Sequence, residues 1–464
     1  MTTGSDLSNN PGEDTCASIS EPFFQPVDWL TFGATALLVF AVYCATLSPE
    51  VDLGYSGIFS VAATYAGVPH PPGYPLWTFW GWLFTKLLPF SNIAWRASVP
   101  TAVAGALATG IIALMVSRGG EFVVNLAKHR QRFTMREQQG LRAVCGGVAG
   151  CVFGLNGAFW RRAVTADAWP LSILLLCTVL CLLMRWSFSP DANRFLFWSA
   201  FVYGLTLTNS QIQFALAPAI PFIVALTNQS IGRDMLLSAT ALFVSALIGS
   251  FAGLVPELRG HGGQFLIFVL LGAIISTAGI SLAVVTRQAF SKWKVVVGCC
   301  ACLALGLCPY LLPPIASMTN PPMNWAYPRT VEGFYHLVSR GQYERLDATD
   351  NLSLFFLQIG KYLTTFGREF GWCFLPIAVV PFATLHWTPN RLRRWIMGLL
   401  TSFLCLAFLV LALLNPSIDR QSQERVKVFY SASWIIVSIF LGYGLVWIGT
   451  LVSKSSTNRT EKAG

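Results

Sequence analysis

Hydrophobic segments of about 20 residues recur along most of the chain, and short polar segments separate them. A helix of this length crosses the hydrocarbon core of a bilayer, which is about 30 Å thick. The pattern predicts an all-α polytopic membrane protein with about 12 transmembrane helices. The expected spans are residues 29–47, 95–117, 143–160, 168–185, 195–209, 212–228, 235–255, 264–286, 295–315, 371–388, 395–415 and 430–452.

One further apolar segment is harder to place. Residues 74–90, with the sequence YPLWTFWGWLFTKLLPF, are short and rich in aromatic side chains. Such a segment either spans the membrane or lies in its interface as an amphipathic helix. We favour the interface, so that residues 48–94 form one long external loop with juxtamembrane helices. If the segment spans instead, the N-terminus moves outside and residues 48–73 move inside.

The distribution of charge orients the spans. The loop at 118–142 carries six Lys or Arg residues and two acids, and the basic loops at 287–294 and 391–394 contain no acids. The positive-inside rule places these loops in the cytoplasm. The predicted organisation, in chain order, is a disordered cytoplasmic tail at 1–28, a transmembrane domain at 29–453 with a large external loop at 316–370, and a cytoplasmic tail at 454–464.

Composition agrees with a membrane protein. Only 11% of the residues are charged and 54% are hydrophobic, whereas soluble proteins usually carry roughly 25% charged residues. The net charge of +10 is explained by the cytoplasmic loops and indicates no nucleic-acid partner. Most of the twelve cysteines lie in apolar segments, where a free thiol acts as a small hydrophobic group, so no metal site is predicted.

The candidate chemistry lies in four predicted external loops. The first contains Glu50, Asp52 and the proline-rich segment AGVPHPPGYPLW with His70. The others are FWRRAVTADAW with Arg161, Arg162 and Asp167, the loop at 316–370, and NPSIDRQSQERVKVFY at 415–430. Proline restricts its own backbone and that of the preceding residue. The prolines therefore predict a stiff corner, which either holds His70 beside a reaction centre or is purely structural.

The segment GVPHPPGYPLW resembles the hallmark of a bacterial membrane family known as domain of unknown function 2723. That family is related to the animal transmembrane protein O-mannosyltransferases and to the GT-C superfamily of glycosyltransferases. Three further segments resemble blocks of the family: FWRRAVTADAWPL, NPPMNWAYPRTVEGFYHLVSRGQY and KVFY. The resemblance extends from about residue 30 to about residue 450.

The resemblance implies an integral membrane glycosyltransferase in the bacterial inner membrane. Its donor would be a polyprenyl-phosphate sugar, with mannose as the first candidate, and its acceptor a protein or lipid hydroxyl on the non-cytoplasmic face. An acid in the first external loop would activate that hydroxyl as a general base. Cations would bind the leaving phosphate, a task that suits arginine. A divalent cation is an optional cofactor of such chemistry.

The chain departs from the family where this acid is expected. The family commonly has Asp-x-Gly-Glu before the proline motif, and the two acidic positions fall on Tyr55 and Ile58 here. Asp52 or Glu50 would have to replace the missing base. The alternative is that both are solvated charges at a helix end. Asp167 matches a position that is usually Glu, so it would contact the acceptor or a metal, or simply pair with a neighbouring arginine.

The third block in chain order, NPPMNWAYPRTVEGFYHLVSRGQY at 320–343, supplies candidates for binding the phosphate. They are Arg329, His336, Arg340 and Tyr343, in addition to Arg161 and Arg162. Glu332, His336 and Arg340 recur every four residues, so a helix would place them on one face. Such a face would bind phosphate or would be a surface helix with paired charges. Near the last span, Arg420, Arg425 and Lys427 form a second basic group that would bind phosphate or anionic lipid headgroups.

Two other functions remain open from the sequence. The loss of the family acids favours a non-catalytic relative that binds a lipid-linked sugar or lipid phosphate. The number of spans also suits a transporter, but transporters show corresponding interrupted helices in two halves, and no such correspondence is evident here. The sequence identifies neither the sugar, the acceptor nor the oligomeric state.

Overall fold

A computed structural model describes residues 22–128, 134–254, 259, 262–342, 347–349 and 351–463. In these ranges the chain is helical, and its one β-type pairing is an isolated parallel bridge between Val68 and Asn324. The all-α class is confirmed. The α-helices are α1 (Pro26–Ala45), α2 (Ser56–Tyr65), α3 (Pro75–Leu87), α4 (Ile93–Lys128), α5 (Met135–Gly154), α6 (Gly157–Ala163), α7 (Trp169–Ser187), α8 (Asn193–Asn209), α9 (Ala219–Thr227), α10 (Gln229–Phe251), α11 (Gly262–Thr286), α12 (Trp293–Gly306), α13 (Leu312–Met318), α14 (Val331–Val338), α15 (Leu352–Phe370), α16 (Phe374–Ala383), α17 (Asn390–Leu404), α18 (Val410–Leu414) and α19 (Arg420–Ala463).

Eight helices of the described chain are long and apolar enough to cross a bilayer, or nine if α5 and α6 form one bent span. The polytopic membrane class is therefore confirmed. Each expected span overlaps helical structure. Three of them fall on helices that are shorter than a membrane span: α8, α16, and α9 with the short 3₁₀ helix before it. The expected span 143–160 bends by 74° between α5 and α6.

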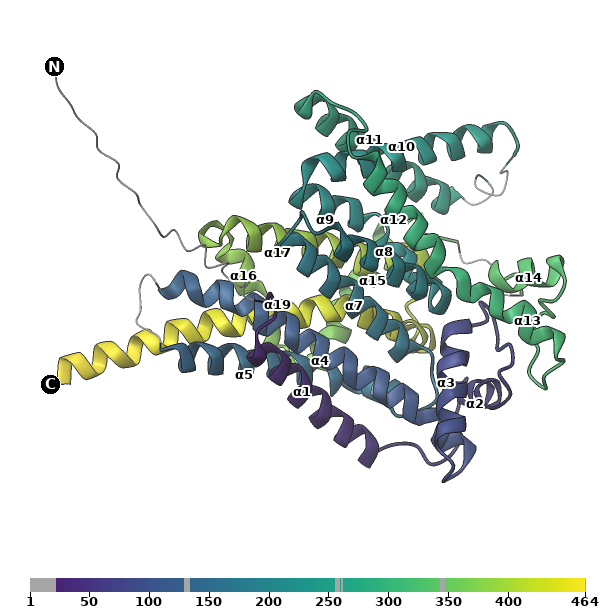
Figure 1. Cartoon of the computed structure of the whole chain (residues 1–464), viewed down its shortest axis with the longest axis horizontal. Helices are drawn as coiled ribbons and strands as arrows, with labels where there is room; N and C mark the ends of the chain where they lie inside the picture. The colour runs from purple at the N-terminus through teal and green to yellow at the C-terminus, as the bar shows by residue number, and fades with distance from the viewer. Residues whose placement is uncertain are drawn as a thin grey trace, which may run out of the picture.

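The aromatic segment at 74–90 forms the 13-residue helix α3. At 1.5 Å per residue this helix is about 20 Å long, which is less than the hydrocarbon thickness of about 30 Å. Figure 1 shows α2 and α3 at the end of the bundle opposite the C-terminal end of α19, with α3 running across the direction of α4. This length and direction suit an interfacial helix.

Helix α4 is the centre of the bundle and contacts α1, α5, α7 and α19. Small residues allow the backbones of such helices to approach closely. At Gly146 and Gly150 of α5, an added Cβ atom would lie 2.7 Å from the carbonyl oxygens of Ala113 and Thr109, respectively, in α4. The pairing of α4 with α5 therefore depends on glycine at these two positions.

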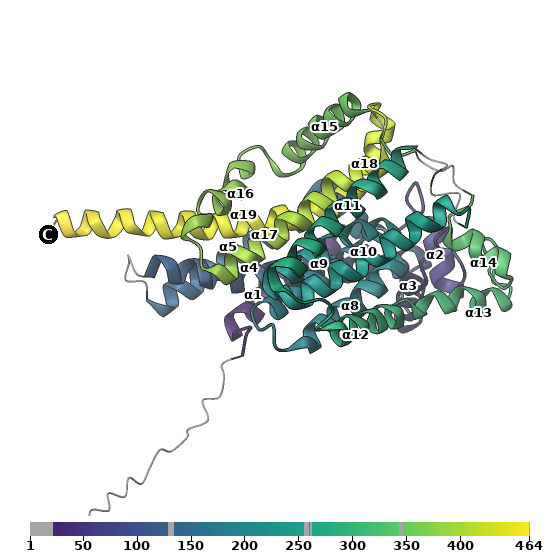
Figure 2. The ribbon, with the colours of Figure 1, turned by 90° about the horizontal axis from the view of Figure 1, so that it is seen from above.

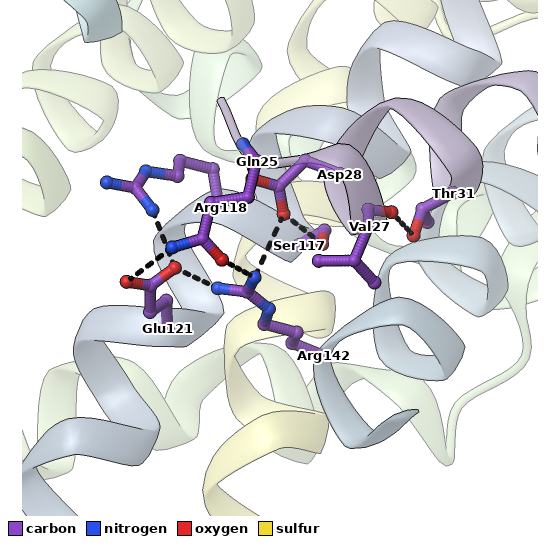
Figure 3. A network of polar contacts seen from close by, with 8 residues as sticks. All are labelled: Gln25, Val27, Asp28, Thr31, Ser117, Arg118, Glu121 and Arg142. Carbon is purple, nitrogen blue, oxygen red and sulfur yellow. Dashed lines mark hydrogen bonds and ion pairs between the residues drawn. The ribbon is translucent and has the colours of Figure 1, made fainter. Parts of the chain in front are cut away.

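The start of α1 differs from the predicted tail. The helix begins at Pro26, and Asp28 in its first turn is fully buried instead of belonging to a disordered segment. Asp28 accepts hydrogen bonds from the Gln25 backbone N–H (2.8 Å) and the Ser117 hydroxyl (2.6 Å). Figure 3 shows how these groups connect through Arg142 to Glu121. This polar network joins α1, α4 and α5.

Candidate active site

The proline-rich segment forms a tight turn before α3. Val68 pairs with the third family block, donating to the Met323 carbonyl (2.8 Å) and accepting from the Trp325 N–H (3.0 Å). The Gly73 N–H donates to the His70 carbonyl (3.0 Å), and Gly73 has a φ of +91°, which favours glycine. These backbone hydrogen bonds join the turn to the segment around residue 324, about 250 positions later in the chain.

His70 is buried in an aromatic setting at this turn. The residue is 4% exposed, and its ring centre lies 4.3 Å from that of Tyr55 and 5.0 Å from that of Tyr74. Nδ1 lies 3.1 Å from the Pro71 carbonyl oxygen, which can only accept, so Nδ1 carries the hydrogen. Burial is the main cause that lowers the pKa of His70; the Pro71 carbonyl opposes this effect, the positive charge of Arg340 adds to it, and the resulting pKa is about 4. His70 is therefore neutral at pH 7.

This pKa predicts an acid-dependent stability. Because the folded pKa is about 4 and the ordinary value is 6.5, the unfolded chain binds more protons between these values. Stability should therefore fall as the pH drops from 6.5 towards 4, by at most about 1.4 kcal/mol per pH unit. His70→Gln should remove this part of the acid dependence. Melting temperatures of the detergent-purified proteins from pH 7 to pH 4 test it, and parallel curves for the two proteins would contradict it.

The second loop supplies a carboxylate with both oxygens occupied. Asp167 Oδ2 accepts from Arg162 Nη1 (2.9 Å), and Oδ1 accepts from the Trp169 backbone N–H (2.7 Å) at the start of α7. The Asp167 residue is 9% exposed. Asn156 caps the preceding short helix α6 by accepting from the Phe159 N–H (3.0 Å). Asp167 is therefore held firmly beside Arg162.

The first loop supplies a less restricted carboxylate. The Asp52 side chain is 36% exposed, and its Oδ2 lies 3.9 Å from Arg161 Nη2. Its Oδ1 accepts from the Leu53 N–H (2.8 Å). Tyr55, at the position of the family Asp, is half exposed, and its ring lies tilted against that of His70. Asp52 is thus less restricted than Asp167 and remains in the wall of a cavity.

The third block is arranged differently from the prediction. Helix α14 ends at Val338, and Arg340 has a left-handed φ of +57°. The predicted helical face shared by Glu332, His336 and Arg340 is therefore wrong, because the helix stops before Arg340. Arg329 is exposed and donates to the Asn320 side chain (2.7 Å). Tyr343 lies outside the described residues.

Two adjoining cavities collect most of these side chains. The larger cavity, of about 860 Å³, has five cations and four carboxylates in its wall: Arg161, Arg162, Arg420, Arg425, Lys427, Asp52, Asp167, Glu369 and Glu424. The smaller cavity, of about 290 Å³, is lined by His70, Tyr55, Asp167 and three arginines, Arg162, Arg340 and Arg425. Residues of all four predicted loops thus meet at one place.

Three predicted residues are not brought to these cavities. Glu50, Arg329 and His336 are exposed and are absent from the walls of both. Among the contacts described, Glu50 takes part through its backbone carbonyl, which accepts from the Ser48 hydroxyl (2.8 Å). These residues were predicted from the segments in which they lie. The segment does not determine where a loop side chain points.

Glu369 is the main residue that sequence reasoning did not single out. It lies one position before the end of α15, and its side chain is 11% exposed. An acid at the end of an aromatic-rich helix, in the segment GREFGW, is the signal that indicates such a site. Arg425 and Lys427 were considered only as a second basic group, and the structure places both in the wall of the larger cavity.

The carboxylates are arranged for pairing with arginine. Within the described residues, no three His, Cys, Asp or Glu side chains lie close enough together to hold a metal ion. Asp52 and Asp167 lie beside Arg161 and Arg162 instead. This donor set does not fit a divalent cation held by protein ligands alone.

The chain is similar to one protein family and to relatives that carry the same name. The family model described as the N-terminal domain of protein O-mannosyl-transferase TMEM260 matches residues 56–231. Protein O-mannosyl-transferase TMEM260 of Mus musculus is 27% identical over 217 residues, which are 45% of this chain and 28% of that relative. Protein O-mannosyl-transferase tmem260 of Dictyostelium discoideum is 22% identical over 419 residues, which are 87% of this chain and 43% of that relative.

The resemblance to an O-mannosyltransferase-like membrane family is confirmed by these matches. The chain aligns with less than half of the length of either relative. The family-model match includes His70, Arg162 and Asp167 but neither Asp52 nor Glu369.

Proposed function

Because the chain is similar to an O-mannosyltransferase-like family of membrane proteins, we propose that it is an integral membrane glycosyltransferase of the GT-C type. It transfers a sugar, with mannose as the first candidate, from a polyprenyl-phosphate donor to a protein or lipid hydroxyl. One observation carries this proposal. Four carboxylates, a neutral histidine and several arginines from four distant segments line one pair of adjoining cavities.

The smaller cavity supports binding of the phosphate. Its wall holds Arg162, Arg340 and Arg425 against a single carboxylate, Asp167. Guanidinium groups match the geometry and charge of phosphate oxygens. As the bond between the sugar and the phosphate breaks, negative charge grows on the phosphate, and nearby arginines stabilise it.

The larger cavity supports attack by the acceptor. Asp52 in its wall would take the proton of the acceptor hydroxyl while the oxygen bonds to the anomeric carbon of the sugar, and the polyprenyl phosphate leaves. A general base must lie within hydrogen-bond reach of the nucleophile and must be able to accept a proton. Asp167 is less suited, because its oxygens already accept from Arg162 and from the Trp169 N–H.

An apolar groove next to the proline turn suits the hydrocarbon chain of the donor. It has a volume of about 370 Å³, and α2, α3 and α13 line it with Tyr65, Phe79, Trp82, Leu312 and Ile315. Gly73 contributes to the groove, whereas Pro72 and Tyr74 contribute to the smaller cavity. A lipid with its phosphate in the cavity would therefore reach the groove across one turn.

The cellular setting is part of the proposal. The positive-inside rule supports a non-cytoplasmic face for the cavities, because the basic loops are predicted on the other side. The bacterial inner membrane is supported by the resemblance in the proline-rich segment alone, since both compared relatives are eukaryotic.

A non-catalytic lipid-phosphate binding protein is the second candidate. It is favoured by Tyr55, which faces the cavities from the position where the family carries Asp. Tyrosine is not ionised at neutral pH and cannot replace a carboxylate base. The basic cavity walls would then bind the lipid without transferring its sugar.

Sugar incorporation into membranes that contain the protein separates the two candidates. We expect radiolabelled mannose from polyprenyl-phosphate mannose to enter a protein or lipid product with the wild type. Arg340→Gln should lower incorporation about tenfold, since a hydrogen bond to a charged group is lost. Arg329→Gln, outside both cavities, is the matched control and should leave it unchanged. No incorporation with mannose, glucose or arabinose donors, together with binding of polyprenyl phosphate, would favour the binding protein.

A further inference from the structure

Glu369 connects three segments of the chain that meet at the larger cavity. Its Oε2 accepts from the Ala158 backbone N–H (2.9 Å) in α6. Its Oε1 forms an ion pair with Lys427 Nζ in α19. Glu369 itself belongs to α15, which Figure 2 shows at the margin of the bundle. One carboxylate, whose side chain is only 11% exposed, therefore holds α15, α6 and α19 together.

Helix α6 needs such an anchor. It has seven residues, and a bend of 74° separates it from α5. A helix of two turns has little stability of its own. Ala158 lies four residues before Arg162, so the bond to Glu369 fixes the turn from which Arg162 extends. The directions of Arg161 and Arg162 thus depend on the Glu369 carboxylate.

The same carboxylate locates the facing wall. Lys427 lies in the first part of α19 with Arg420 and Arg425, which also line the larger cavity. The Lys427 side chain is 22% exposed and has a second acid, Glu424, at 3.9 Å. The Glu424 side chain is 65% exposed and that of Glu369 is 11% exposed, so Glu369 is the less exposed partner of this lysine. Removal of the Glu369 charge would leave Lys427 beside the other cations of the wall.

We propose that Glu369 is a positioning residue that fixes the two basic walls of the larger cavity relative to one another. One wall is α6 with Arg161 and Arg162, and the other is the start of α19 with Arg420 and Arg425. Held in this way, Arg162 and Arg425, which line both cavities, bind the phosphate of the donor lipid in the smaller cavity. Glu369 acts through the arginines and does not take the acceptor proton, because both of its oxygens are engaged. The inference rests on the proposed function for the identity of the ligand.

Two substitutions separate the bonds of Glu369. Glu369→Gln keeps an oxygen that can accept from the Ala158 N–H but removes the charge opposite Lys427. Glu369→Leu removes both contacts with a side chain of similar size. Glu424→Gln is the matched control, because Glu424 lines the same cavity and lies near the same lysine but is largely exposed.

Hydrogen exchange followed by mass spectrometry reports on α6 without any ligand. We expect faster exchange of residues 157–163 in Glu369→Leu, near wild-type exchange in Glu369→Gln, and no change in Glu424→Gln. Unchanged exchange of this segment in Glu369→Leu would overturn the proposal.

Lipid binding and turnover report on the consequence for the site. With polyprenyl phosphate as the probe, Glu369→Leu should bind about tenfold more weakly than the wild type, as expected for a lost charge-assisted contact. With polyprenyl-phosphate mannose, its KM should rise similarly while kcat changes less than about twofold. Glu369→Gln, which keeps the contact with Ala158 but not the charge opposite Lys427, should bind with an affinity between those of the wild type and Glu369→Leu. Faster exchange with wild-type affinity for the lipid would overturn the positioning role, because α6 would then be loosened without effect on the site.

The two proposals fail in different ways. A wild type that binds polyprenyl phosphate but transfers no sugar contradicts the proposed function, and the binding of the Glu369 variants still decides the inference. If Glu369→Leu transfers sugar as well as the wild type, only the inference is contradicted. A wild type that binds no polyprenyl phosphate contradicts both.

Discussion

Asp52→Asn is expected to reduce sugar transfer by about 100-fold or more, because a positioned general base contributes about 10²–10⁴-fold to the rate. Asparagine keeps the size of the side chain and the acceptor for the Leu53 N–H (2.8 Å). It cannot take a proton from a hydroxyl. The expected change is in kcat, with the KM for the donor nearly unchanged, since Asp52 is absent from the wall of the smaller cavity.

Two further substitutions give this experiment its meaning. Glu50→Gln changes an exposed neighbouring acid outside both cavities, and it should leave transfer unchanged. Asp167→Asn should raise the KM for the donor about tenfold by releasing Arg162, since a charge-assisted bond is weakened. Loss of transfer in Asp167→Asn alone, with Asp52→Asn fully active, would move the base to the second loop.

Arg142→Met is expected to lower the free energy of unfolding by about 3–5 kcal/mol, the usual effect of removing one partner from a buried ion pair. The Arg142 side chain is 3% exposed, is bonded to Gln25 and Glu121, and lies 3.9 Å from Asp28 (Figure 3). Methionine fills similar space but leaves the buried Asp28 and the partly buried Glu121 without this cation. The loss is therefore electrostatic and does not arise from a cavity.

Unfolding in mixed micelles measures this effect. Arg136→Met, which changes an exposed arginine in the first turn of α5, is the matched control and should alter stability by less than about 0.5 kcal/mol. Asp28→Asn, which retains hydrogen-bonding groups for Ser117 and the Gln25 backbone, should lie between the two. Equal stability of Arg142→Met and Arg136→Met would show that the network contributes nothing to folding.

The candidate site could be predicted only in part. Asp52, His70, Arg161, Arg162 and Asp167 were recognisable, because each is a polar residue in a short segment next to an apolar helix. Arg340 was recognised for a wrong reason, since the helix expected to carry it ends at Val338. Glu369 was missed because its two partners are distant in the chain. Ala158 lies 211 positions before it, and Lys427 lies after it in another helix.

The sequence by itself determined the membrane class, the helical fold and the positions of the long apolar helices. These properties depend on the length of each apolar segment compared with the bilayer, and every segment satisfies its backbone hydrogen bonds internally. Only the tertiary structure decided which charges meet. Contacts such as Glu369 with Ala158 or Arg142 with Gln25 depend on how helices pack and where short helices bend. Packing of this kind follows from the combined shapes of many side chains, and a local pattern of residues does not contain it.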